Sequence, residues 1–183
     1  NSVNPDMEFW MTEYCLIENN VEIDGNGRDL GIDPALYTAR LIHTDLTVSN
    51  ASSWQWWLAV SPYDYKDGLV YIDNNFNDGQ VYDSKLLWGL GNYSSFIEPG
   101  ASRIGVRRSD NKSVSQSIDG LLASAYRNQN DQLVCVVVNQ RNILIPLKLG
   151  AEGQDANAIK VYQTSALSGD NLSYKGEINS EDI

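Results

Sequence analysis

The stretch FWMTEYCLI, residues 9–17, places one carboxylate inside a mostly apolar and aromatic run. Residues 8–17 are short and apolar enough to predict a buried β-strand. Burying an unpaired charge is costly or shifts its pKa, so Glu13 is either paired with an Arg or a backbone donor, or catalytic. A long loop follows the strand directly, and carboxylates at such strand ends face the active-site mouth of a (β/α) barrel. We therefore favour the catalytic interpretation.

The chain that follows this strand predicts a loop and then a helix. Residues 19–33 are polar and rich in Gly, which is typical of a long loop. Asp33 before Pro34 predicts a helix over 34–49, with Asp33 as its N-cap. We expect one face of this helix to be apolar and His43 to be an ordinary, partly exposed helix residue. The residues of the apolar face are Ala35, Ala39, Ile42 and Leu46.

A second unit of the same kind follows. Residues 53–60, SWQWWLAV, predict another buried strand, and residues 61–83 predict a long excursion with a short strand at 69–72. Residues 84–97 predict a helix that is capped by Asp83 or Ser84 and ends before Pro99-Gly100. Alternating strands and helices indicate parallel βα units.

The second half of the chain changes its period. Short strand-like segments are separated by polar turns, a pattern typical of an antiparallel β-sandwich. We place the boundary near residues 99–102, which predicts βα units over 1–100 and a sandwich over 101–183. The predicted strands are 102–109, 121–128, 132–140, 143–150, 158–165 and 172–178.

Composition narrows the possible partners. The 183 residues carry a formal net charge of −11, which disfavours nucleic acid and anionic membranes as partners. No apolar run reaches the 18 residues of a membrane-spanning helix. We expect no metal and no cofactor, because neither a His/Cys/Asp cluster nor a phosphate-binding Gly loop is present. Cys15 and Cys135 lie far apart in apolar runs, which predicts two buried free thiols.

Three segments carry a resemblance to a known family. FWMTEYC, SSWQWWLAV and LWGLGNYSSFIEPGASRIGV together resemble glycoside hydrolase family 30, and the forms around Glu13 and Trp54 are most similar to its endo-β-1,6-galactanase branch. The resemblance implies the seventh and eighth βα units of a (β/α)8 TIM barrel, then the family's β-sandwich. It also implies a retaining hydrolase with two glutamates, of which Glu13 matches the nucleophile. The family's acid/base glutamate lies on the fourth barrel strand, so we expect this chain to be a catalytically incomplete fragment.

The aromatic run of the second strand supplies candidate substrate contacts. Alternation puts Trp54 and Trp56 on one face, and Gln55 and Trp57 on the other. The resemblance places Trp54 beside the scissile sugar, and a Trp next to Gln55 can form a stacking floor with a hydroxyl reader. We include Tyr14 and Trp56 as further substrate contacts and assign Trp57 to packing. Core filling stays the alternative for Trp54.

These observations lead to one principal hypothesis and two alternatives. The principal hypothesis is the C-terminal portion of a secreted or periplasmic endo-acting β-glycosidase, with an oligosaccharide or polysaccharide as substrate and the N-terminal part of the same enzyme as partner. Family relatives that cut β-1,6-glucan, xylan or glucosylceramide keep the sugar open. The alternatives are a non-catalytic carbohydrate-binding β-sandwich module and an inactive fragment.

Overall fold

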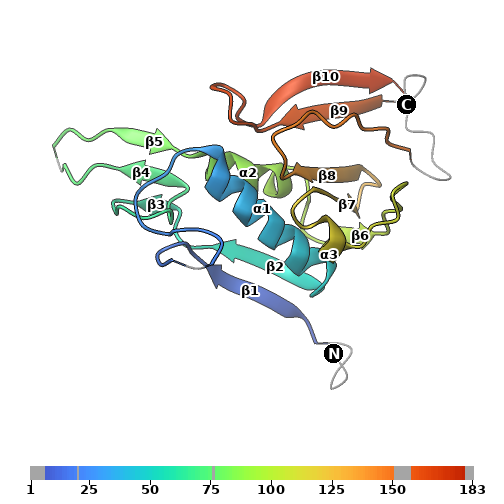
Figure 1. Ribbon diagram of the computed structural model, residues 1–183, viewed down its shortest axis with the longest axis horizontal. Coiled ribbons are helices and arrows are strands. Elements are labelled where there is room, and N and C mark those ends of the chain that lie inside the picture. Colours follow the sequence, from blue (N-terminus) through green and yellow to red (C-terminus); the bar gives the residue numbers. More distant parts are fainter. Residues whose placement is uncertain (1–6, 20, 76, 151–157, 180–183) are drawn as a thin grey trace.

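The computed structural model describes residues 7–19, 21–75, 77–150 and 158–179 (Figure 1). Strands and helices alternate in its first half, and antiparallel strands dominate the second. The elements are β1 (Phe9–Tyr14), α1 (Ile32–Thr47), β2 (Ala51–Trp56), β3 (Val60–Ser61), β4 (Val70–Ile72), β5 (Val81–Asp83), α2 (Lys85–Ser94), β6 (Ser102–Ile104), α3 (Val114–Ser117), β7 (Leu121–Arg127), β8 (Leu133–Asn139), β9 (Ala158–Gln163) and β10 (Ser173–Asn179).

The first strand is parallel to the second, as the sequence predicts. Helix α1 connects β1 to β2, which makes a parallel βα unit. However, β1 is shorter than the predicted strand and is largely exposed: 54% of the surface of Trp10 and 39% of that of Phe9 remain accessible. The prediction of a buried strand was therefore wrong for the described residues. The reason is that β1 and β2 form a sheet of two strands, which leaves the far edge of β1 unpaired.

Helix α1 begins earlier than predicted. Its N-cap is Gly31, so the prediction of Asp33 as N-cap was wrong, and Pro34 is the third helical residue. Pro is tolerated throughout the first turn because the N–H groups there have no partner within the helix. Asp33 instead lies in the first turn, where its negative charge favours the helix dipole.

His43 is buried and not partly exposed, which corrects the prediction for this residue. Only 1% of its surface is accessible. It lies one turn after Ala39 on the same face of α1, and this face packs into the core. Burial and, to a smaller extent, the positive charges of Arg108 and Arg103 together lower the pKa of the imidazole to about 4.

The excursion between β2 and α2 forms its own small sheet. Strand β4 lies within the predicted segment 69–72, pairs parallel with β3 and pairs antiparallel with β5. Ser84, one of the two predicted caps, is the N-cap of α2, and its side chain accepts a hydrogen bond from the backbone N–H of Leu87. The sheet and the cap together bring the chain from the end of β2 to the start of α2.

The second half contains two antiparallel sheets, β6–β7–β8 and β9–β10. Residues 143–150 are not a strand, so that prediction was wrong. Pro146 has no N–H to donate to a ladder, and Leu144 is 99% exposed. A short helix, α3, precedes β7 where no helix was predicted.

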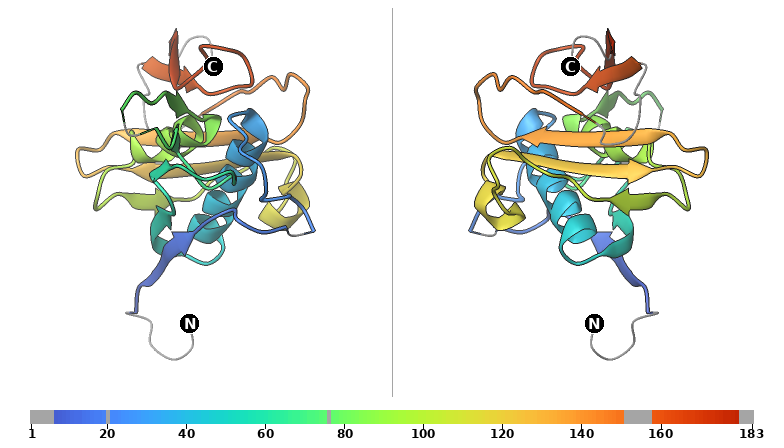
Figure 2. Two further views of the ribbon diagram at one scale, coloured as in Figure 1. Left: turned by 90° about the vertical axis from the view of Figure 1, so that its left-hand side faces the viewer. Right: turned by 90° about the vertical axis from the view of Figure 1, so that its right-hand side faces the viewer.

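The core lies where the two halves of the chain meet. Helices α1 and α2 contact each other, and α1 also contacts β2, β7 and β8. Figure 2 shows the helices between the β1–β2 pair and one face of the β6–β7–β8 sheet. One apolar cluster unites both halves, and its buried members are Ala39, Ile42, Tyr93, Leu122, Tyr126, Val134, Val136 and Val138. The predicted boundary near residues 99–102 thus runs through a shared core.

Candidate active site

Glu13 lies in an irregular part of the parallel pair. Met11 pairs with Trp54 and Tyr14 pairs with Trp56, so three steps along β1 match two steps along β2. Such a bulge re-aims a side chain and is common beside active sites. Glu13 is exposed at this bulge, one residue before the end of β1. The sequence predicted that Glu13 lies near the C-terminal end of its strand, and the structure confirms this position, with the side chain exposed.

Three of the predicted sugar contacts gather on the helix side of the sheet. The rings of Tyr14, Trp54 and Trp56 lie with their centroids 6.1–6.2 Å apart in each pair. The indole N–H of Trp54 donates to Asp45 of α1 at 2.9 Å. Trp54 also packs against the shared core. This position favours the core-filling alternative for Trp54.

The Tyr14 hydroxyl is likewise directed to helix α1. It lies 3.0 Å from the hydroxyl oxygen of Tyr37. Burial and this hydrogen bond raise the pKa of Tyr14 well above its ordinary value. The indole N–H of Trp56 donates to the carbonyl oxygen of Asp67 at 2.7 Å. The aromatic cluster thus has its polar groups bonded within the protein.

Gln55 lies near the end of β2, and Trp57 follows the last residue of this strand. Gln55 stands between Trp54 and Trp56 in the strand, so its side chain turns to the face opposite theirs. Gln55 is exposed, and 51% of the surface of Trp57 is accessible. The peptide bond between Trp57 and Leu58 is cis. Sequence reasoning assigned Trp57 to packing, although the alternation in WQWW already separated it from Trp54.

The loops that follow β1 and β2 are joined to each other. The backbone N–H of Lys66 donates to Gly25 at 2.9 Å, and the Asp64 carboxylate accepts from the N–H of Arg28 at 2.7 Å. Gly25 is buried, and a Cβ there would lie 2.6 Å from the backbone N and O atoms of Glu18. These contacts join residues 24–28 and 64–66 into one loop rim beyond the strand end that carries Glu13.

The acids of the first loop are used within the protein. Glu22 forms an ion pair with Arg40 of α1. The Asp24 carboxylate accepts hydrogen bonds from the backbone and side chain of Asn26, which lower the pKa of Asp24. Neither residue is free to act as a second catalytic carboxyl in this arrangement.

The described residues also bear on metals, thiols and membranes. They contain no group of three or more His, Cys, Asp or Glu side chains arranged to hold a metal ion. Both thiols are free, as predicted, but Cys135 is exposed and Cys15 only partly buried, so the expectation of burial was wrong. No helix in the described part of the chain is long and apolar enough to cross a membrane.

Comparison with protein families gives two matches on this chain. Residues 1–71 match the model described as O-Glycosyl hydrolase family 30, and residues 100–168 match the model described as Glycosyl hydrolase family 30 beta sandwich domain. The first match contains Glu13 and the WQWW run. The second contains β6, β7, β8 and β9.

Solved structures share the fold. A conserved exported protein from Bacteroides fragilis is 33% identical, with a TM-score of 0.83, over 97% of this chain and 37% of its own. A GH30 endoxylanase from Clostridium papyrosolvens C71 is 20% identical over 94% of this chain and 36% of its own, with a TM-score of 0.67. The glycoside hydrolase family 30 subfamily 8 xylanase Xyn30A from Clostridium acetobutylicum is 22% identical over 96% and 38%, with a TM-score of 0.66.

The solved structures are much longer than this chain, and two of them have low sequence identity to it. The two xylanases are below 25% identity and support the fold alone. This chain spans less than two-fifths of the length of each solved structure. The two family matches cover the two parts of the chain separately, residues 1–71 in the parallel βα units and residues 100–168 in the antiparallel strands.

Proposed function

We propose that this chain is the C-terminal part of a retaining, endo-acting β-glycoside hydrolase, and that Glu13 is the nucleophile. The observation that carries the proposal is the position of Glu13: exposed, at a bulge, near the C-terminal end of a parallel strand. The match of residues 1–71 to family 30 supports the same chemistry.

A retaining mechanism assigns two roles to two carboxyl groups. One carboxylate attacks the anomeric carbon and forms a glycosyl-enzyme, while the other protonates the leaving oxygen and later activates water. Glu13 takes the first role. We place the acid/base on the fourth strand of a TIM barrel, in a part of the enzyme outside residues 1–183. Residues 1–183 alone are then inactive.

The exposed surface of β1 supports a larger barrel. Phe9 and Trp10 of β1, and Ile17 shortly after this strand, are apolar side chains with between 39% and 54% of their surface accessible. Apolar surface of this kind is stabilised when another element covers it. We propose that further barrel strands of the same enzyme pair with the open edge of β1 and cover these residues.

We place the sugar next to Glu13 against Trp57. The accessible indole of Trp57 has a flat apolar face that can cover the C–H face of a pyranose ring. The exposed amide of Gln55 can read a hydroxyl group on the same side. Tyr14, Trp54 and Trp56 then pack on the helix side of the sheet and support the strand ends from below the sugar site. Direct contact of Trp54 with sugar stays a prediction, and its bonded indole N–H weighs against it.

For the polysaccharide we propose β-1,6-galactan or a related glycan. The support is the likeness of the sequence around Glu13 and Trp54 to the galactanase branch, while the xylanase neighbours support the fold only. We further propose that the enzyme is exported, since the 33% identical protein from Bacteroides fragilis is described as exported. A polymer substrate outside the cell fits this location.

The test is a glycan panel with the full-length enzyme. We expect hydrolysis of β-1,6-galactan, with mid-chain cuts in early products and retained configuration when the first product is followed by proton NMR. Residues 1–183 alone, tested on the same panel, should release no sugar. Hydrolysis with inversion would refute the retaining mechanism. Saturable glycan binding by a full-length protein that cleaves nothing would instead favour a carbohydrate-binding module.

A further inference from the structure

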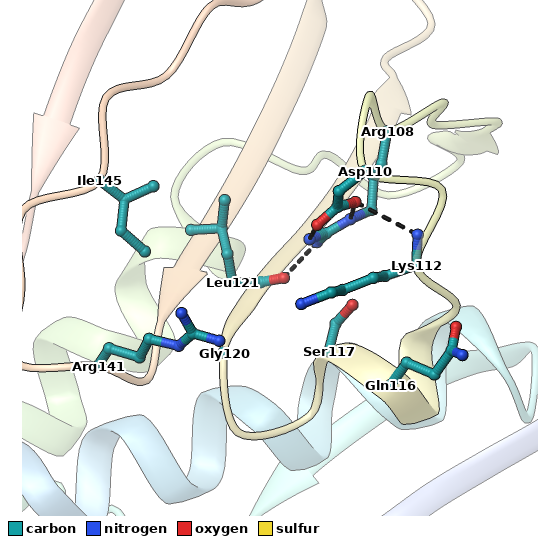
Figure 3. Close-up of a pocket in the computed structure, with 9 residues that line it drawn as sticks. All are labelled: Arg108, Asp110, Lys112, Gln116, Ser117, Gly120, Leu121, Arg141 and Ile145. Atoms are coloured by element: carbon teal, nitrogen blue, oxygen red, sulfur yellow. Dashed lines mark hydrogen bonds and ion pairs between the residues drawn. The ribbon is translucent and has the colours of Figure 1, made fainter.

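A second polar site lies in the β-sandwich, apart from Glu13 and the strand ends. It is a pocket of about 140 Å³ between the segment before α3, the start of β7 and the residues after β8 (Figure 3). A single water requires roughly 10–15 Å³ of such space, so the pocket admits a larger group. Neither the β1–β2 pair nor the loop rim contributes to its lining.

The lining is strongly basic for a chain of net charge −11. Arg108, Lys112 and Arg141 line the pocket together with one carboxylate, that of Asp110. Three positive charges therefore face one negative charge. A concave site lined by one sign of charge concentrates ions of the opposite sign.

The single carboxylate is already engaged. The Asp110 oxygens accept from Arg108 Nε at 2.8 Å and from Nη2 at 2.7 Å, and Arg108 Nη1 donates to the carbonyl oxygen of Leu121. The guanidinium of Arg108 lowers the pKa of Asp110 far below its ordinary range. Arg108 and Asp110 thus form a fixed pair that holds the pocket wall.

The other two cations are available. Among the described residues, the side chains of Lys112 and Arg141 form no hydrogen bond or ion pair, although the charge of Lys112 also helps to lower the pKa of Asp110. Figure 3 shows both groups reaching into the pocket beside Gly120 and Leu121. A Cβ at Gly120 would lie 3.3 Å from Arg141 Nη2, so the absence of a side chain there leaves room for the guanidinium.

We propose that this pocket binds a small oxyanion through Lys112 and Arg141, with the Arg108–Asp110 pair as its frame. Ammonium and guanidinium groups form charge-assisted hydrogen bonds with carboxylate, sulfate and phosphate oxygens. Two sources share this chemistry: the carboxylate of an acidic sugar in a polysaccharide, and a free inorganic oxyanion. The site is independent of catalysis at Glu13.

The test measures anion binding to the chain at fixed ionic strength by calorimetry. The probes are inorganic sulfate, inorganic phosphate and D-glucuronate, with D-glucose as the neutral control. Amide shifts of Gly120 and Leu121 in NMR spectra report whether binding occurs at the pocket. We expect saturable binding of at least one anion, shifts at both amides and no binding of glucose. Tighter binding of glucuronate identifies the acidic sugar as the source, and tighter binding of sulfate or phosphate identifies the free ion.

Two variants and a matched control make the test specific. We expect Lys112→Gln and Arg141→Gln each to weaken binding about tenfold, because each removes a charge-assisted hydrogen bond. Lys160→Gln removes an exposed cation on β9, outside the pocket, and the variant should bind anions as the unaltered chain does. Anion affinity that is unchanged in both pocket variants, or amide shifts absent from Gly120 and Leu121, would overturn the proposal.

Discussion

The backbone N–H of Trp57 donates to the carbonyl oxygen of Tyr14 at 2.9 Å. This bond joins the last residue of β1 to the first residue after β2. It therefore holds the segment with the exposed Trp57 indole beside the strand end that carries Glu13. Tyr14 itself turns its ring to the helix side, against Trp54. At this strand end, Tyr14 therefore packs towards the helices, while Trp57 stays exposed and available to a substrate.

The two tryptophans should respond differently to the same substitution. In the full-length enzyme, we expect Trp57→Phe to weaken glycan binding and turnover with little change in melting temperature, since the indole is half exposed. We expect Trp54→Phe to lower the free energy of unfolding by about 1–2 kcal/mol, because it removes the hydrogen bond to Asp45 and leaves a gap at the core.

Melting temperature and oligosaccharide kinetics of both variants distinguish the two roles. The resemblance to family 30 makes the opposite prediction for Trp54, namely a direct sugar contact. A Trp54→Phe enzyme that melts normally but turns over slowly would support that prediction and contradict ours. Each variant is the control for the other.

Stability should depend on pH through the one histidine of the chain. Burial lowers the pKa of His43 to about 4, while the unfolded chain protonates near 6.5. The unfolded state therefore binds more protons between these values, and stability falls as the pH drops from about 6.5 towards 4. The free energy of unfolding falls by roughly 3 kcal/mol over the whole range.

Denaturant unfolding across this pH range checks the effect of His43. We compare the chain with His43→Gln, which does not titrate there. The slope of unfolding free energy against pH should be shallower in the variant, whatever its absolute stability. Equal slopes across the range from about pH 4.5 to about 6.5, which is most of this window, would show that His43 is not held neutral in the folded state.

The shared core predicts that the β-sandwich strands depend on the helices. We expect isolated residues 101–183 to keep the antiparallel pairs but to expose Leu122, Val136 and Val138, which share one buried cluster with Ile42 and Tyr93 in the chain. We expect a β-type circular dichroism spectrum without a cooperative thermal transition. A helical spectrum would contradict the sheet assignment, and a sharp transition like that of residues 1–183 would contradict the dependence on the helices.

Gly25 should be irreplaceable in the rim. A Cβ at this position would lie 2.6 Å from backbone atoms of Glu18, so Gly25→Ala must displace the loop after β1. Overpacking of this kind costs about 1–3 kcal/mol. Gly105→Ala, where no atom lies within 4 Å of the added Cβ, is the control. We expect lower stability and activity for Gly25→Ala only, and equal melting temperatures of the two variants would refute the argument.

Local signals in the sequence predicted most elements but not their surroundings. The cap at Ser84 and the parallel order of β1 and β2 follow from short-range patterns. Burial does not, because it depends on distant partners: β1 looks like a core strand yet pairs with β2 alone among the described residues, and His43 is buried on the core-facing side of α1. Segment 143–150 has the apolar residues of a strand, but Pro146 opposes a ladder.

In the candidate site, too, local features could be predicted from the sequence, while the surroundings of the side chains could not. Glu13 could be proposed as a catalytic residue from the sequence, since a carboxylate in an apolar run before a long loop is a strong local signal. The sequence did not indicate which of Trp54 and Trp57 meets a helix, because alternation of side chains separates two faces of a strand without saying which face is covered. The hydrogen bond from Trp54 to Asp45 settles which side α1 covers.

The most direct test of the central proposal is the turnover number of Glu13→Gln in the full-length enzyme. Gln keeps the shape of the side chain but removes the nucleophilic oxygen. We predict a fall of several orders of magnitude at an unchanged melting temperature, while Glu18→Gln, an exposed acid in the loop after β1, keeps near-normal turnover. A Glu13→Gln enzyme that cleaves at close to the normal rate would contradict the assignment of Glu13 as nucleophile.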